Sequence, residues 1–383
     1  MSTINFPPNL SYWEIQEYLQ DINLLVVGSG IVGLTTAIFY KKQHRKHRVL
    51  IVEKGVLPAG ASTKNAGFAC FGSPSEILAD LESSSEEEVY SLIAKRLKGL
   101  KELRSLVGDK NLDYQPCGGF EIFRKEDEGL FEKCSAFISN ANTQLRSRLE
   151  LDDTYSIADN QINEFGFAGV EHLLLNKYEG AIDTGKMMNS LIGIASNLGI
   201  KIINGMELTD YAENGSLVET NFSNGFTLKS NKLHIATNGF ASTTLPQLDV
   251  KPARAQVLIT SEIDNLKLNG TFHMKEGFYY FRNVGKRVLF GGGRDLDIVG
   301  ETNNKLETTS LIQTKLDELL KTVILPSSEY KIEHRWAGIM GVGQNKTTIV
   351  KQLSSHVSCA VRLGGMGVAI GTSIGKESAR LIS

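Results

Sequence analysis

The sequence has few cysteines, few prolines and no long hydrophobic run. Its 383 residues include four cysteines, Cys70, Cys117, Cys134 and Cys359, which form no C-x-x-C pair. Their scatter argues against a zinc site or a disulfide framework and fits a reducing compartment, so we expect a cytoplasmic protein without a metal centre. The longest apolar stretch is broken by glycine and is too short to span a bilayer. Residues 1–20 combine no basic segment with an apolar one, so we expect no signal peptide.

The sequence also lacks an excess of charge of either sign. Its formal net charge is −2, which gives no electrostatic reason to expect binding to nucleic acid or to an anionic membrane. The basic residues 41–48 fall at the end of a predicted helix, where cations complement the helix dipole. A hydrophobic content of 41% is sufficient for a full core, and the length predicts about two to three domains.

What the sequence does contain is a G-x-G-x-x-G motif between a strand pattern and a helix pattern. Four apolar residues lead into Gly28, whose freedom at positive φ suits a tight turn. Gly30 leaves room for a pyrophosphate, and Gly33 allows the helix to pack close to the strand. A second apolar strand follows and ends at Glu53, about 20 residues on, where a carboxylate binds a ribose diol. The order of these features predicts a dinucleotide site.

Further elements predict a mixed chain. A loop rich in small residues covers 60–70, a packing helix covers 85–107, and a strand is expected over 222–228. The strand and helix patterns alternate at the start, middle and end of the chain, whereas two intervening stretches read as antiparallel strands plus helix. We therefore expect an α/β (α+β) fold in which a Rossmann-like dinucleotide-binding domain (1–80, 165–250 and 335–383) interleaves with an antiparallel-sheet domain (81–164 and 251–334).

Five segments in this order resemble the D-amino-acid oxidase family of FAD enzymes, which includes glycine oxidase, sarcosine oxidase and gamma-glutamylputrescine oxidase. They are the glycine motif with Glu53, the G-A-S-T-K-N-A-G loop at 60–67, the A-T-N-G segment at 236–239, the P-A-R-A-Q-V strand at 252–257, and the glycine run 364–367 before a terminal helix.

The resemblance implies a cofactor site at the matching positions. The glycine motif would hold the FAD pyrophosphate, loop 60–67 would line the ribityl chain and one flavin edge, and residues 237–238 would lie near the adenine side. Reduced flavin is negatively charged at N1/O2, and exposed amides at the start of a helix would stabilise that charge; the alternative for the glycine run is simple helix packing. The expected cofactor residues are Gly28, Gly30, Ile31, Val32, Gly33, Glu53, Lys54, Ser62, Thr63, Lys64, Asn65, Ala66, Gly67, Thr237, Asn238, Gly364, Gly365, Met366 and Gly367.

The resemblance favours FAD over NAD. The chain contains one complete fingerprint, whereas a pyridine-nucleotide reductase would need a second. Relatives that attach flavin covalently use a histidine where Lys64 stands, or a cysteine within the region of 340–344, and neither is present. We therefore expect non-covalent FAD. The arginine that binds substrate carboxylate in glycine oxidase is replaced by Met340, which makes a simple amino-acid substrate less certain.

Hydride transfer to flavin needs orientation and dry surroundings and requires no nucleophile. The side chains considered for orienting the substrate are Tyr279, Tyr280, Arg282, His334, Arg335 and Trp336. Because strand side chains alternate, either Tyr279 or the pair Tyr280 and Arg282 faces the flavin.

The resemblance favours Tyr279, with core packing as the alternative. Arg282 would bind a carboxylate, or else form a surface ion pair. Lys64 and His334 are candidates for activating oxygen; for His334 the alternative is an ordinary strand histidine.

Two enzymatic functions follow, and the alternative to both is a flavoprotein domain retained as a binding or assembly module. One is oxidation of an amine or amino-acid-like substrate with O2 as acceptor, giving H2O2. The other is a flavin dehydrogenase of a hydroxy acid or amine that passes electrons to a quinone or carrier protein.

Overall fold

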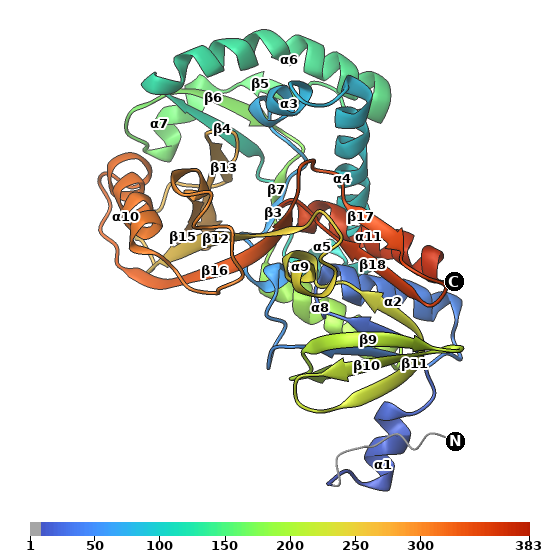
Figure 1. The fold of residues 1–383 in the computed structure, drawn as a ribbon. Helices are drawn as coiled ribbons and strands as arrows, with labels where there is room; N and C mark the ends of the chain where they lie inside the picture. Colours follow the sequence, from blue (N-terminus) through green and yellow to red (C-terminus); the bar gives the residue numbers. More distant parts are fainter. Residues whose placement is uncertain (1–8) are drawn as a thin grey trace.

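A mostly parallel sheet built on the first strand of the glycine motif forms the centre of one lobe (Figure 1). The structure is a computed structural model and describes residues 9–383; the first eight residues of the stretch considered for a signal peptide lie outside it. The main path of this sheet is β17-β18-β11-β1-β2-β8, with β9 and β10 attached to β11 as antiparallel strands. Its strands are β1 (Ile22–Val27), β2 (Val49–Glu53), β8 (Lys201–Asn204), β9 (Leu208–Asn214), β10 (Leu217–Phe222), β11 (Thr227–Ile235), β17 (Ile349–Gln352) and β18 (Val357–Val361).

Alternation along β1 explains why this sheet is buried on both faces. Leu24 and Val26 pack into the core beneath the helices, whereas Leu25 and Val27 pack on the opposite side with the strands of the β9–β10 hairpin. The pairing of β1 with β2 and with β11 is parallel, so the carboxyl ends of all three strands meet at one edge. Ligands of open α/β sheets bind at that edge.

A second, largely antiparallel sheet forms the other lobe. Its order is β16-β12-β15-β14-β13-β4-β6-β5, and a separate two-stranded sheet joins β3 (Phe68–Ala69) to β7 (Gly180–Ala181). One face of the large sheet packs on α10 in an aromatic core that contains Phe272, Phe281 and Phe290. The strands are β4 (Gly119–Arg124), β5 (Tyr155–Ile157), β6 (Val170–Asn176), β12 (Lys251–Thr260), β13 (Thr271–Met274), β14 (Tyr279–Val284), β15 (Arg287–Gly292) and β16 (Ile332–Val342).

The helices begin where the sequence supplies caps. Ser73 and Ser85 each form a capping box with the glutamate three residues later, and the Asp183 carboxylate accepts from the Lys186 amide. The helices are α1 (Tyr12–Glu14), α2 (Ile31–Gln43), α3 (Pro74–Leu81), α4 (Glu86–Val107), α5 (Asp109–Leu112), α6 (Glu128–Leu149), α7 (Ile162–Phe165), α8 (Thr184–Asn197), α9 (Ala241–Thr244), α10 (Ser310–Leu319) and α11 (Gly367–Ile382).

The predicted fold class is confirmed, with two differences in detail. Residues 222–228 do not form one strand: β10 ends at Phe222, and a turn with Gly225 at positive φ returns the chain into β11. The predicted boundary at 165 precedes β6, which pairs with β4 in the second sheet. We retain the two-domain division as a proposal, with the chain returning to the cofactor lobe after Asn176. No helix within residues 9–383 has the length and apolar character needed to cross a bilayer.

Gly99 sets how closely α4 approaches α11, because a Cβ at this position would overlap the carbonyl oxygen of Ala369. We expect Gly99→Ala to lower the free energy of unfolding by about 1–3 kcal/mol. Gly193→Ala in α8 is the matched control, since a Cβ there meets no atom within 4 Å. Alanine should stabilise that helix by about 0.5–1 kcal/mol. Urea unfolding of both variants measures the difference, and equal effects would contradict the packing.

Candidate functional site

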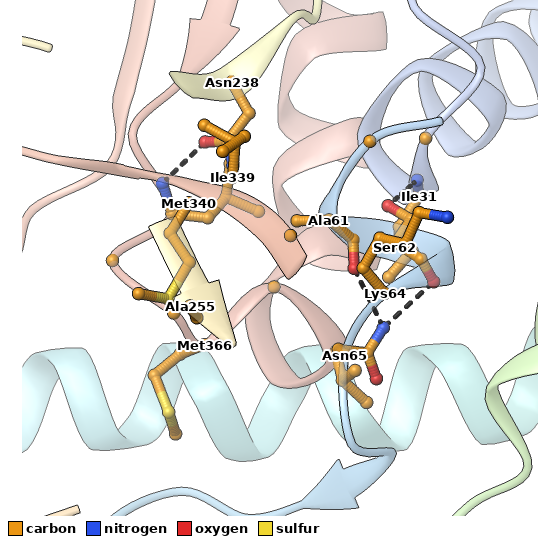
Figure 2. Close-up of a pocket in the computed structure, with 18 of the residues that line it drawn as sticks. Ile31, Ala61, Ser62, Lys64, Asn65, Asn238, Ala255, Ile339, Met340 and Met366 are labelled. Carbon is orange, nitrogen blue, oxygen red and sulfur yellow. Dashed lines mark hydrogen bonds between the residues drawn. The ribbon is translucent and has the colours of Figure 1, made fainter. Parts of the chain in front are cut away.

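A cavity of about 610 Å³ lies between the two lobes, at the carboxyl edge of the parallel sheet. One side is formed by the turn after β1, loop 60–67, the segment after β11 and the start of α11. The opposite side comes from the second sheet, including Ala255, Gly338 and Met340. Figure 2 shows Ser62, Lys64 and Asn65 facing Ile339 and Met340 across this space.

The glycine motif forms the turn that the sequence predicts. Gly28 has φ +107°, and a Cβ there would lie 2.7 Å from the Ala236 carbonyl oxygen. A Cβ on Gly33 would overlap the Gly28 carbonyl, so Gly33 serves helix packing and does not line the cavity. Gly30, Ile31 and Val32 do line it. The first turn of α2 therefore presents backbone to the cavity.

Glu53 is buried and holds the turn together. One carboxylate oxygen accepts from the Ser29 amide at 3.0 Å and from its hydroxyl at 2.8 Å, and the other accepts from the Gly55 amide at 3.1 Å. Glu53 also lines the cavity, as does Lys54, whose Nζ lies 3.5 Å from the centre of the Phe240 ring. The adenosine end predicted for this site thus has an acid, a cation and an aromatic ring around it.

Loop 60–67 contributes most of its predicted residues, but not Thr63. Ser62 accepts a hydrogen bond from the Ile31 amide at 2.9 Å, which links the loop to α2. Asn65 donates to the carbonyls of Ala61 and Ser62 and accepts from the Gly67 amide. The Thr63 hydroxyl instead donates to the Pro58 carbonyl at 2.7 Å and lies outside the cavity wall. Ala66 and Gly67 are also in the wall.

The predicted segments after β11 and before α11 meet in the structure. Asn238 Oδ1 accepts from the Leu363 amide at 3.2 Å, and the Thr237 hydroxyl is buried without a hydrogen-bond partner in the described chain. Gly364 and Gly365 have positive φ, and a Cβ on Gly364 would meet only one atom, at 4.0 Å. The run 364–367 therefore leaves open backbone at the start of α11, all of it in the cavity wall.

On the second sheet the orientation of the tyrosine pair is the reverse of the expectation. Tyr279 is 1% exposed and packs in the aromatic core beneath the sheet, whereas Tyr280 lines the cavity. The reason is register: Tyr280 pairs with His273 on the cavity face, and Tyr279 shares the core face with Phe281. Phe68 meets the rings of both His273 and Tyr280 edge-on.

Arg282 and His334 lie outside the cavity wall. Arg282 is buried and donates to the carbonyls of Ala66 at 2.6 Å and Ile182 at 2.8 Å, so it neither clamps a carboxylate nor forms a surface ion pair. His334 is exposed and stacks on Trp336. Lys64 is in the wall; its carbonyl accepts from Trp336 Nε1 at 2.9 Å, and its Nζ has no hydrogen bond or ion pair with the described residues.

Sequence reasoning missed a charged group of residues at the end of the cavity bounded by α3, α4 and β13: Glu76, Arg96, His273 and Lys346. Burial would raise the pKa of Glu76, but the charges of His273 (when protonated), Arg96 and Lys346, together with the hydrogen bond from the Ser73 amide, hold the pKa below its ordinary value. Burial lowers the pKa of His273, with Glu76 opposing the shift, so this imidazole is neutral at pH 7. A single histidine or arginine inside a helix or strand pattern carries no positional signal, which is why the sequence did not point to them.

A model of the family described as "FAD dependent oxidoreductase" matches residues 23–381. The chain belongs to this family. No curated protein sequence matches it. Within residues 9–383 no group of three or more histidine, cysteine, aspartate or glutamate side chains could hold a metal ion.

Solved structures with the same fold align over nearly the whole chain. L-proline dehydrogenase from P. horikoshii has a TM-score of 0.74 at 14% identity and covers 95% of this chain and 94% of its own. Glycine oxidase from Bacillus cereus has a TM-score of 0.74 at 16% identity, with 94% of each chain covered. Iminodiacetate oxidase from Chelativorans sp. has a TM-score of 0.72 at 16% identity, with 94% and 95% covered.

The cavity fits the cofactor of the family. The backbone at Gly364 borders open space, a Cβ at Gly28 or Gly30 would collide with Ala236 or Ser62, and the Thr237 hydroxyl has no hydrogen-bond partner in the described chain. A volume of about 610 Å³ lies in the range usual for ligand sites. These are the features that a dinucleotide requires.

The two tyrosines should differ sharply on mutation. Tyr279→Phe removes a hydroxyl that lies beside Asp295 in the core beneath the sheet and outside the cavity wall, so flavin reduction should be unchanged. Tyr280→Phe removes a hydroxyl on the cavity side and should slow reduction by a substrate or raise its KM. Anaerobic stopped-flow reduction compares them; a larger effect at Tyr279 would contradict the orientation.

Proposed function

We propose that this protein oxidises an amine or an amino-acid-like substrate with bound FAD, and that O2 reoxidises the cofactor. The observation that carries the proposal is that one cavity combines the dinucleotide turn with a buried end containing a neutral histidine, an ionised carboxylate and an aromatic edge. An amine must be neutral to lose hydride, and this end contains the groups that can hold it and take its proton.

The residues proposed to hold FAD are those of the cavity wall on the cofactor side. Gly28, Gly30 and the start of α2 would bind the pyrophosphate, Glu53 the ribose, and the amides of 364–367 the flavin pyrimidine edge. We propose non-covalent binding. Cys70 is the cysteine in the wall, and burial raises the pKa of its thiol well above the ordinary value, so it is protonated and a poor nucleophile. Release of the flavin when the protein is denatured would support non-covalent binding.

Bound FAD supplies the acceptor for the hydride that leaves the amine-bearing carbon of the substrate. The chain's own contribution is placement and proton transfer. Glu76 Oε2 is engaged by the Ser73 amide at 2.9 Å, which leaves Oε1 for a substrate ammonium group. The ring of His273 has no hydrogen bond with the described residues and is the proposed proton acceptor. Phe68 and Tyr280 form the wall beside it and exclude water.

The structural neighbours favour a substrate of this class. The relatives named above are a glycine oxidase, an iminodiacetate oxidase and a proline dehydrogenase, all named for amino acids or a closely related amine. Their identity of 14–16% establishes the fold, and the substrate class remains our proposal.

For the oxidative half, amine plus O2 gives imine plus H2O2, which balances without a further reactant. We propose Lys64 as the cation that stabilises negative charge developing on oxygen, because its Nζ is free of ion pairs with the described residues and its side chain lies on the cavity wall. The second candidate is a dehydrogenase that passes electrons to a quinone or carrier; the fold of L-proline dehydrogenase is the observation that favours it.

We further propose a cytoplasmic location, since all four cysteines are free.

An anaerobic screen of amines, amino acids and hydroxy acids tests the reaction, with loss of flavin absorbance as the readout. We expect bleaching with a member of the amine or amino-acid group, and one equivalent of H2O2 per turnover after air is admitted. Bleaching without peroxide, with rapid reduction of an added quinone, would establish the dehydrogenase instead. A flavin that no compound of these classes bleaches would contradict both.

His273 gives the reaction a defined pH dependence. Its pKa is lowered, so the neutral ring is available at pH 7 and is lost as the pH falls through that lowered value. The rate constant for flavin reduction should therefore be level from neutral pH upward and decline in acid. His273→Asn should reduce it by about 100-fold or more at pH 7, and the remaining rate should keep rising into the alkaline range, where the amine is itself neutral. The same pH profile in parent and variant would contradict this role.

A further inference from the structure

Arg96 is a buried guanidinium with most of its donors unused. It lies on α4, is 5% exposed and lines the cavity. Nη1 donates to the Phe71 carbonyl at 3.1 Å, Nε is buried without a partner, and Nη2 has no partner in the described chain. A guanidinium has five donors, and a buried cation without a paired anion is costly. A guanidinium placed in this way would be stabilised by an anion bound beside it.

The carboxylates nearby do not complete it. Glu76 lines the same cavity and is close enough for Arg96 to lower its pKa, yet the two side chains form no ion pair within 4.0 Å. Burial raises the pKa of Glu179 to about 8, so that carboxyl is mostly neutral at pH 7, and it accepts from the Phe71 and Gly72 amides. The Arg96 guanidinium and the Glu76 carboxylate thus line the same cavity without forming an ion pair.

The other cations of the wall are differently placed. Lys346 is already paired with Asp80 on α3. Arg294 is only half-buried, follows β15 and lies near Glu301, which is held by Arg254 through two bonds of 2.7 Å. Arg96 is the deeply buried member of this set. Its position is fixed by the close packing of Gly99, one turn along α4, against Ala369 at the start of α11.

We propose that Arg96 and Glu76 together form the head-group site of the substrate, with Arg96 binding a carboxylate and Glu76 the adjacent ammonium group. The site selects a zwitterionic amino acid over an amine without a carboxylate. This inference rests on the proposed oxidation for its substrate, but anion binding by Arg96 stands without turnover. Guanidinium binds carboxylate through paired, charge-assisted hydrogen bonds, and Arg96 has the donors free for it.

Carboxylate binding to the holoenzyme tests Arg96 directly. Benzoate and acetate are titrated while the flavin absorbance is followed, with no substrate present. Arg96→Gln should weaken binding by about tenfold to 100-fold, and Arg96→Lys, which keeps the charge but loses the fork, by less. Arg104→Gln is the matched control, because Arg104 lies on the same helix and pairs with Asp109 at the surface. Flavin content and thermal unfolding establish that each variant is folded.

Glu76→Gln should not weaken benzoate binding as Arg96→Gln does. It removes a negative charge facing Arg96 and keeps an oxygen for the Ser73 amide, so benzoate should bind equally or more tightly. The KM of an amino-acid substrate should rise because the ammonium group loses its partner. In Arg96→Gln that KM should rise also, whereas the KM of a carboxylate-free amine should not.

The results that would overturn the head-group site differ from those that would contradict the proposed oxidation. Unchanged benzoate affinity in Arg96→Gln, or a loss confined to Arg294→Gln, would overturn the head-group site whatever the reaction is. Weakened benzoate binding in Arg96→Gln, with no amine or amino acid able to bleach the flavin, would support anion binding at Arg96 and contradict the proposed oxidation instead. A KM increase of equal size for amines with and without a carboxylate would overturn the assignment of Arg96 to the carboxylate.

Discussion

The close approach of α2 to the end of β1 is the constraint on which the cavity depends. Gly33 has no room for a Cβ against the Gly28 carbonyl, and Gly28 itself adopts a φ that favours glycine. Parallel pairing of β1 with β2 and β11 then carries Glu53 and Thr237 to the same edge. The shape of the cavity on its cofactor side is thus set mainly by the backbone, and side chains modify it.

This dependence explains which parts of the site could be read from the sequence. Backbone sites leave glycine signatures at fixed spacing, so Gly28, Gly30 and the run at 364–367 were predictable, as was the mixed fold. Their roles toward the cofactor stay predictions. Thr63 belongs to a matching motif, yet a local bond to Pro58 turns its hydroxyl away.

The substrate side could not be read in the same way. The choice between Tyr279 and Tyr280 depends on strand register, which a shift of one residue reverses. Arg282 has the chemistry of a carboxylate clamp, but its donors are engaged by two backbone carbonyls. Glu76 and Arg96 come from two consecutive helices and His273 from a strand nearly 180 residues further on, so only folding brings the three to one cavity. Spacing within a segment carries no information about such a group.

The bonds of Trp336 and Arg282 have a mechanical consequence. Trp336 on β16 donates to Lys64, and Arg282 on β14 donates to Ala66, so the second sheet is attached directly to loop 60–67 of the cofactor lobe. Separating the two lobes would remove the backbone acceptors of the buried Arg282 guanidinium. The free-energy cost would be far above that of moving a surface side chain. We therefore expect small molecules to reach the cavity by local rearrangement at its rim rather than by a hinge motion between the lobes.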